Sequence, residues 1–69
     1  MTRKEDFIEA AAQYQTAVAA LEKIRDIFND YSVFDLVAMR TYDLAQSYSY
    51  ALSYSGNRAL IEAQNENTA

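Results

Sequence analysis

Apolar residues recur at alternating steps of three and four over the first 28 residues of the chain. This spacing is typical of one face of an amphipathic helix, and an unbroken run of it forms a heptad stripe. The stretch opens with "TRKE", in which Thr2 and Glu5 have the spacing of a capping box. The pattern therefore predicts a helix over about residues 3–28. Its stripe consists of Phe7, Ala10, Tyr14, Ala17, Leu21, Ile24 and Phe28.

A second helix start is indicated by "NDYSVFDL". Ser32 and Asp35 have the spacing of another capping box, and Tyr31 and Leu36 fit a hydrophobic staple across it. These signals predict a helix over about residues 33–55. Because so few residues separate the two helices, they are expected to be antiparallel neighbours. The inward face of the second helix is expected to contain Phe34, Val37, Ala38, Thr41, Leu44, Ala45, Tyr48, Ala51 and Leu52.

The run "SYSYALSYS" at residues 47–55 does not by itself favour a helix. Its alternation of large side chains with Ser or Ala is typical of a β-strand. A strand needs pairing partners, however, and no other segment of the chain alternates in this way. We therefore predict a helix here. Gly56 is expected to end or kink it, residues 57–64 to form a short further helix, and residues 65–69 to fray.

The second helix is also predicted to carry an outward-facing facet. When its inward face points to the first helix, four large residues fall on a different side: Leu36, Met39, Tyr50 and Tyr54. Two interpretations are open. The facet packs in a homodimer or against the last segment of the chain, or it docks another protein, because tyrosine supplies a large contact area at low entropic cost and is enriched at interface hot spots.

The composition is informative mainly because the chain lacks cysteine and histidine. Sixty-nine residues make one domain, here 1–69, and a chain this short buries only about 60% of the surface that its unfolded form exposes. Disulfides and metals stabilise many small domains, but this chain has neither cysteine nor histidine. Self-association is the remaining way to stabilise such a small domain. We therefore predict an all-α fold, an antiparallel helical hairpin with a short C-terminal helical extension, which dimerises into a four-helix bundle. The expected core and oligomer seam consists of Phe7, Ala10, Tyr14, Ala17, Leu21, Ile24, Phe28, Phe34, Val37, Leu44, Tyr48 and Leu52.

The same absences limit the chemistry of the chain. Without histidine or cysteine there is no Ser-His-Asp or Cys-His nucleophile and no imidazole or thiolate ligand for a metal. One glycine cannot form a phosphate-binding loop. Carboxylates at helical spacing, such as Glu22 and Asp26, are expected to lie on a solvated face. The prediction is a protein that is not an enzyme and that has no catalytic residue, metal or cofactor.

Charge and hydropathy narrow the partners further. Ten acidic and six basic residues give a formal net charge of −4, whereas nucleic-acid binding needs clustered basic residues. Nucleic acid is therefore not an expected partner, although Arg3, Lys4, Lys23 and Arg25 would be the residues to contact phosphate. The longest apolar run, at positions 17–21, has only five residues, so no membrane span is expected. The absence of a signal-peptide h-region favours a soluble, cytoplasmic protein.

Three functions remain open. The first is a non-catalytic adaptor, inhibitor or regulator that acts through protein–protein contacts, as many small accessory proteins of phages and mobile elements do. The second is a structural subunit that polymerises. A helical hairpin of this length resembles in outline the subunits of secretion needles, although "NDYS" stands where that family has a proline-bounded turn. The third is a nucleic-acid-associated regulator.

Overall fold

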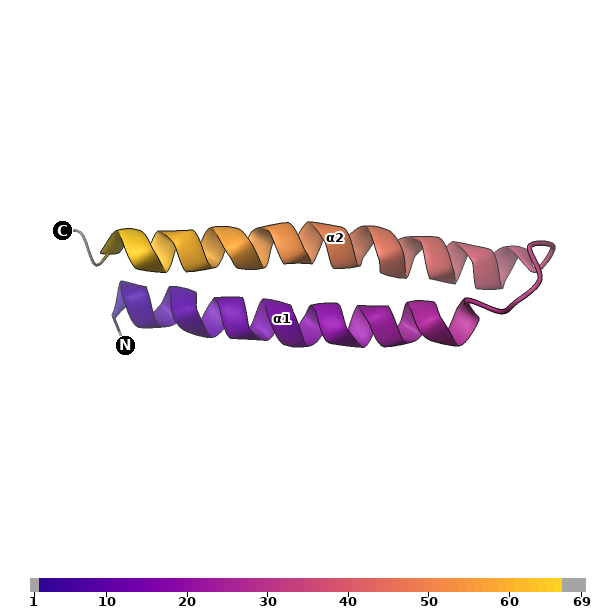
Figure 1. The fold of residues 1–69 in the computed structure, drawn as a ribbon, viewed down its shortest axis with the longest axis horizontal. Coiled ribbons are helices and arrows are strands. Elements are labelled where there is room, and N and C mark those ends of the chain that lie inside the picture. The colour runs from indigo at the N-terminus through magenta and orange to yellow at the C-terminus, as the bar shows by residue number, and fades with distance from the viewer. Residues whose placement is uncertain (1, 67–69) are drawn as a thin grey trace.

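The computed structural model describes residues 2–66, which form two long helices joined by a short loop (Figure 1). Helix α1 spans Arg3–Phe28 and helix α2 spans Leu36–Asn65. The helices run antiparallel and pack side by side, so the start of α1 lies beside the end of α2 (Figure 1). Within the described residues there is no strand. The predicted all-α hairpin is therefore confirmed, and its principal extents are 54, 15 and 13 Å.

The start of α1 is fixed by the predicted capping box. The Thr2 hydroxyl accepts a hydrogen bond from the Glu5 backbone N–H at 3.1 Å, and the Glu5 carboxylate accepts one from the Thr2 backbone N–H at 3.4 Å. Two backbone amides that have no partner within the helix are thus satisfied. The helix ends at Phe28, so its predicted bounds are confirmed.

The start of α2 differs from the prediction. The N-cap is Asp35, whose side chain accepts from the Ala38 backbone N–H at 3.1 Å, and the helix begins at Leu36 instead of residue 33. Ser32 instead accepts from the Phe34 backbone N–H at 3.1 Å and so stabilises the turn before the helix. Aspartate and serine cap helices about equally well, and here the later residue takes that role.

The predicted hydrophobic staple across this cap is also absent. Tyr31 packs on Phe28 at the end of α1, with ring centroids 5.0 Å apart, while Leu36 is 77% exposed. Aromatic pairs at this distance add a favourable contact. The loop therefore closes against α1, and the first turn of α2 is left uncovered.

The two candidate caps can be separated by mutation. Replacing Asp35 by alanine is expected to lower the free energy of unfolding by about 1 kcal/mol, because the Ala38 amide loses its acceptor. Replacing Ser32 by alanine is expected to cost only a few tenths of a kcal/mol. Urea denaturation of both variants at one protein concentration measures the difference. A larger loss for the Ser32 variant would show that the helix begins at the earlier cap.

Helix α2 continues through Gly56, so the prediction of a break or kink followed by a separate short helix is wrong. Gly56 does not have a positive φ, and one helix of 30 residues runs to Asn65. Gly56 instead lies where the two helices pack closely. It is buried against Tyr14 of α1, and a Cβ added at Gly56 would lie 3.2 Å from the Tyr14 Cβ. Of the tail expected to fray, Asn65 is helical, and residues 67–69 lie outside the described residues.

The two helices meet along a seam of small residues on α2. Its buried members recur at steps of three, four or seven, the spacing of a heptad. They are Ala38, Ala45, Ser49, Gly56, Ala59 and Ala63. In α1, the only buried residue is Ala11, and half-buried large residues flank it. They include Phe7, Tyr14, Val18, Leu21 and Phe28. Small side chains let the helix backbones approach closely, so large residues of α1 cover small residues of α2.

The alternating "SYSY" run is helical, as predicted, but the residue that it buries is Ser49. The Ser49 hydroxyl donates to the Gln46 backbone carbonyl at 2.8 Å, so this buried polar group has a partner. Tyr48 and Tyr50 lie on either side of Ser49 and are both exposed. The prediction that Tyr48 points toward α1 is therefore wrong for the single hairpin.

Candidate interaction surfaces

A two-helix hairpin leaves most of its large apolar side chains uncovered. No large side chain among the described residues is fully buried, and the buried positions hold only Ala, Gly and Ser. The accessible surface of the chain is 5189 Å², whereas a globular monomer of 7.8 kDa exposes about 4,400 Å². The exposed large apolar residues are Ile8, Ile24, Ile27, Tyr31, Val33, Phe34, Leu36, Val37, Leu44, Tyr48, Tyr50, Tyr54, Leu60 and Ile61.

Two adjoining hollows lie on one side of the hairpin. Ala10 and Tyr14 line both hollows, Ala17 lines one, and Ser55 and Arg58 of α2 line the other. These residues therefore share one side of the molecule. Because residues seven apart lie in line on packed helices, the row that contains Ala10 and Ala17 continues along α1, and the row that contains Ser55 continues along α2 toward the loop.

This side, which we call the broad face, is apolar over most of its length. Its α1 row consists of Ala10, Gln13, Ala17, Ala20, Ile24 and Ile27, and its α2 row of Val37, Thr41, Leu44, Tyr48, Ala51 and Ser55. None of these residues is charged, although the same side carries Arg3, Arg58 and Glu62 near the chain ends. Surface helices in a monomer usually carry charged residues opposite the core. An uncharged stretch of this length beside the seam is instead typical of a helix pair that packs against further helices.

The predicted core and oligomer residues divide between the seam and the broad face. Phe7, Tyr14, Leu21, Phe28 and Leu52 are half-buried where the helices meet. The broad face carries the others, with one exception: Ala10, Ala17, Ile24, Val37, Leu44 and Tyr48. The exception is Phe34, which was expected on the inward face of a helix but is 89% exposed in the loop before α2.

Some residues of the broad face were missed by the sequence analysis. Gln13, Ala20 and Ile27 lie on its α1 row but were not among the predicted seam residues. The signal that could have found them is their own seven-residue spacing, which repeats the spacing of Ala10, Ala17 and Ile24 three residues later in the chain.

A second apolar surface lies on the outside of α2. It consists of the predicted Leu36, Met39, Tyr50 and Tyr54, and we call it the outer facet. Leu36, Tyr50 and Tyr54 are 77%, 68% and 68% exposed, whereas Met39 is half-buried near the seam. At 3.6 residues per turn, Tyr54 points about 120° around the helix from Tyr48 of the broad face. The two surfaces therefore lie on different sides of α2.

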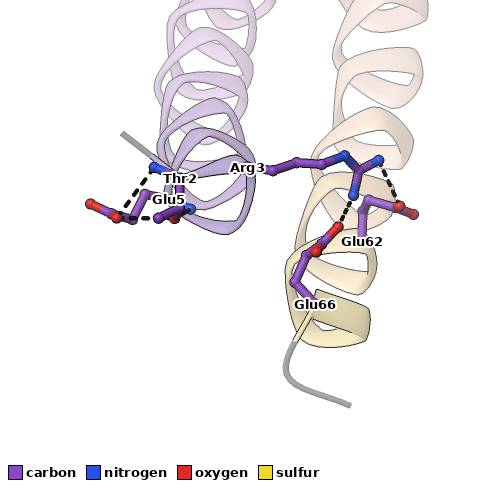
Figure 2. A network of polar contacts seen from close by, with 5 residues as sticks. All are labelled: Thr2, Arg3, Glu5, Glu62 and Glu66. Atoms are coloured by element: carbon purple, nitrogen blue, oxygen red, sulfur yellow. Dashed lines mark hydrogen bonds and ion pairs between the residues drawn. The ribbon is translucent and has the colours of Figure 1, made fainter. Parts of the chain in front are cut away.

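The open end of the hairpin is joined by an arginine (Figure 2). The Arg3 guanidinium pairs with Glu62 at 3.0 Å and also with Glu66, so it links the first turn of α1 to the end of α2. It also lies 4.7 Å from the centroid of the Phe7 ring, a cation–π contact. These side chains are partly exposed, so each pair contributes at most about 1 kcal/mol. The contacts help to align the helix ends rather than to hold the fold.

The basic residues considered for phosphate contact are partly engaged in ion pairs. Arg3 pairs across the helices as above, and Arg25 lies 3.3 Å from Asp26 and 3.8 Å from Glu22 on its own helix. Their positive charge is therefore balanced locally by carboxylates. The described residues also contain no group of three or more acidic side chains gathered at a distance that could hold a metal ion.

Comparisons of the chain with protein families, curated proteins and solved structures found no match. In the part of the chain that the structure describes, neither helix has a stretch long and apolar enough to cross a membrane. What the hairpin offers a partner is thus the mostly apolar broad face and the tyrosines of the outer facet.

Proposed function

We propose that this chain is a non-catalytic interaction protein that works as a homodimer and binds another protein. In this proposal the broad face joins two hairpins into a four-helix bundle, and the outer facet remains on the surface for the other partner. The observation that carries the proposal is the composition of the core. The seam buries only small residues, while large apolar side chains stay exposed on two different sides of α2.

The exposed area supports self-association. The chain exposes about 800 Å² more than a globular monomer of its mass. A standard protein–protein interface buries about 800 Å² on each partner. The hairpin is 54 Å long and 15 Å wide, so one broad side has about the size that such an interface needs. The uncharged rows cover about half of this length, since Arg3, Arg58 and Glu62 line the part near the chain ends. Apolar patches larger than about a few hundred Å² mark interaction sites.

The outer facet supports a role beyond self-association. In a four-helix bundle built on the broad face, Tyr50 and Tyr54 point about 120° away from the bundled side of α2. They are not needed to complete that core. Tyrosine combines a large apolar ring with a hydroxyl that stays hydrated, which is why it is enriched at binding hot spots. We infer that this pair of rings, with Leu36, contacts the other protein.

A variant of the outer facet tests this assignment. Replacing both Tyr50 and Tyr54 by serine is expected to leave the helical content and the dimer mass unchanged, because both rings are solvent-exposed. The same change is expected to abolish capture of a partner from the source cell, a loss of at least 10-fold. The matched control is Tyr48→Ser on the broad face, which is expected to weaken the dimer instead. Circular dichroism, sedimentation and affinity capture give the three readouts.

Three outcomes would contradict this proposal. If the double Tyr50 and Tyr54 variant unfolds or becomes monomeric, the outer facet belongs to the fold or to the dimer. If sedimentation of the unmodified protein shows a monomer at all concentrations up to the millimolar range, the homodimer is wrong. A mass that grows without limit as the concentration rises would favour a polymerising structural subunit, because a closed dimer has a fixed mass above its dissociation constant.

A further inference from the structure

The broad face is hollow in the half near the chain ends. Its two hollows have volumes of ≈ 460 Å³ and ≈ 330 Å³ and adjoin at Ala10 and Tyr14. Together they form a groove that begins near Arg3 and reaches Ala17. The groove exists because alanines stand where larger side chains would fill the space between the helices.

The same face is raised in the half near the loop. Five large apolar side chains stand there on the two rows, and they form a ridge. They are Ile24, Ile27, Val37, Leu44 and Tyr48, which are 37%, 63%, 78%, 42% and 56% exposed. The ridge begins where the groove ends, seven residues beyond Ala17 on α1. One face therefore carries a raised apolar half and a hollow half, and the lining of the hollow half combines alanines with Arg3, Arg58 and Glu62.

We propose that two copies dimerise with the ridge of each seated in the groove of the other, which places the loops at opposite ends of the four-helix bundle. This inference rests on the proposed homodimer and specifies its geometry. If a two-fold axis lies in the interface at right angles to the helices, the ridge of each copy faces the groove of the other. Such an interface uses the same patch on both copies, as closed dimers do.

The position of the axis follows from the border between ridge and groove. Ala17 lies at this border, and since Tyr14 is level with Gly56, the border on α2 lies near Ser53. An axis at this level brings Ala17 next to its own copy and sets Ala10 opposite Ile24 of the other copy. Small residues then face large ones along α1, and the two backbones approach closely at the axis. On α2 the same axis sets Tyr48 opposite Arg58 and Leu44 opposite Glu62, which line the groove near the chain ends. Glu62 is already paired with Arg3 of its own chain.

The alternative dimer has both loops at the same end. In that arrangement residues at equal heights meet, so the ridge of one copy would lie against the ridge of the other. The bulky residues would then hold the helices apart, and the two grooves would face each other across unfilled space. Unfilled space between two packed surfaces removes van der Waals contacts from both of them. The opposed arrangement avoids this loss.

Spin labels at exposed positions distinguish the two arrangements. The chain has no cysteine, so Arg40→Cys and Ser53→Cys each give one labelled site at an exposed position. Residue 40 lies 13 residues from the proposed axis level. At 1.5 Å per residue, the two labels at this site should be more than about 40 Å apart. The labels at residue 53, near the axis, should be only about 20–30 Å apart, the width of two helices.

Pulsed electron–electron double resonance at one protein concentration measures both distances. The expected result is one long and one short distance, from residues 40 and 53 respectively. Two short distances would overturn the opposed arrangement and leave the homodimer standing. If neither variant gives an intermolecular distance while both keep the helical content of the unmodified protein, the homodimer itself fails, and the geometry fails with it.

Discussion

Replacing Gly56 by leucine is expected to lower the free energy of unfolding by about 1–2 kcal/mol. Gly56 is buried in the seam, and even a Cβ at this position would lie 3.2 Å from the Tyr14 Cβ. A whole leucine side chain has no room there unless the helices move apart. Overpacking of a close contact costs about 1–3 kcal/mol or more. The better helix propensity of leucine recovers slightly less than 1 kcal/mol, so the loss prevails.

The matched control for this prediction is Asn57→Leu. It places the same side chain one residue later on the same helix, at an exposed position outside the seam. This variant is expected to change the free energy of unfolding by less than about 0.5 kcal/mol. Urea denaturation followed by circular dichroism, at one protein concentration, compares the two. Equal stability of the two variants would show that the helices do not pack closely at Gly56.

The local signals in the sequence predicted the helices well. The capping box at Thr2 and Glu5 gave the start of α1, and the heptad stripe gave its length. The run at residues 47–55 was also correctly assigned to a helix, although its alternation favours a strand. A single strand, however, has nothing to pair with. In such a short chain, the lack of any second strand outweighs local propensity.

The register of the seam was not predicted, because large residues were taken as the core. Two helices alone cannot enclose large side chains, since each ring or branched chain on the seam remains open to water on both sides. Close approach of the backbones instead selects alanine, serine and glycine on α2. The spacing of Ala38, Ala45, Ala59 and Ala63 was visible in the sequence, but it gains meaning only if small residues are allowed to form a seam.

The prediction that Gly56 ends or kinks the helix was wrong for a related reason. An isolated glycine near the end of a helical pattern is often a C-cap, and the polar residues that follow it supported this interpretation. Burial against Tyr14 could not be known without the register of the two helices. Conversely, the sequence predicted that Leu36, Tyr50 and Tyr54 face outward, because tyrosines at helical spacing stand out once the inward direction is roughly known.

Replacing Ala17 by glutamate is expected to raise the dissociation constant of the proposed dimer by about 100-fold or more. Ala17 lies on an uncharged row of the broad face, at the border between its hollow and raised halves. In the proposed dimer, two glutamates would meet at the axis and would lose water without gaining an opposite charge. A 100-fold change corresponds to about 2.7 kcal/mol. Because alanine and glutamate both favour helices, α1 itself should remain intact.

The matched control is Ala19→Glu, which makes the same change on the exposed opposite side of α1. Its dissociation constant is expected to stay within about 3-fold of that of the unmodified protein. Sedimentation equilibrium over a range of concentrations measures both constants, and circular dichroism confirms that both variants are helical. Equal dissociation constants would show that the broad face does not hold the dimer together. A dimer weakened only by Ala19→Glu would place the contact on the other side of α1, where Ile8 is also exposed.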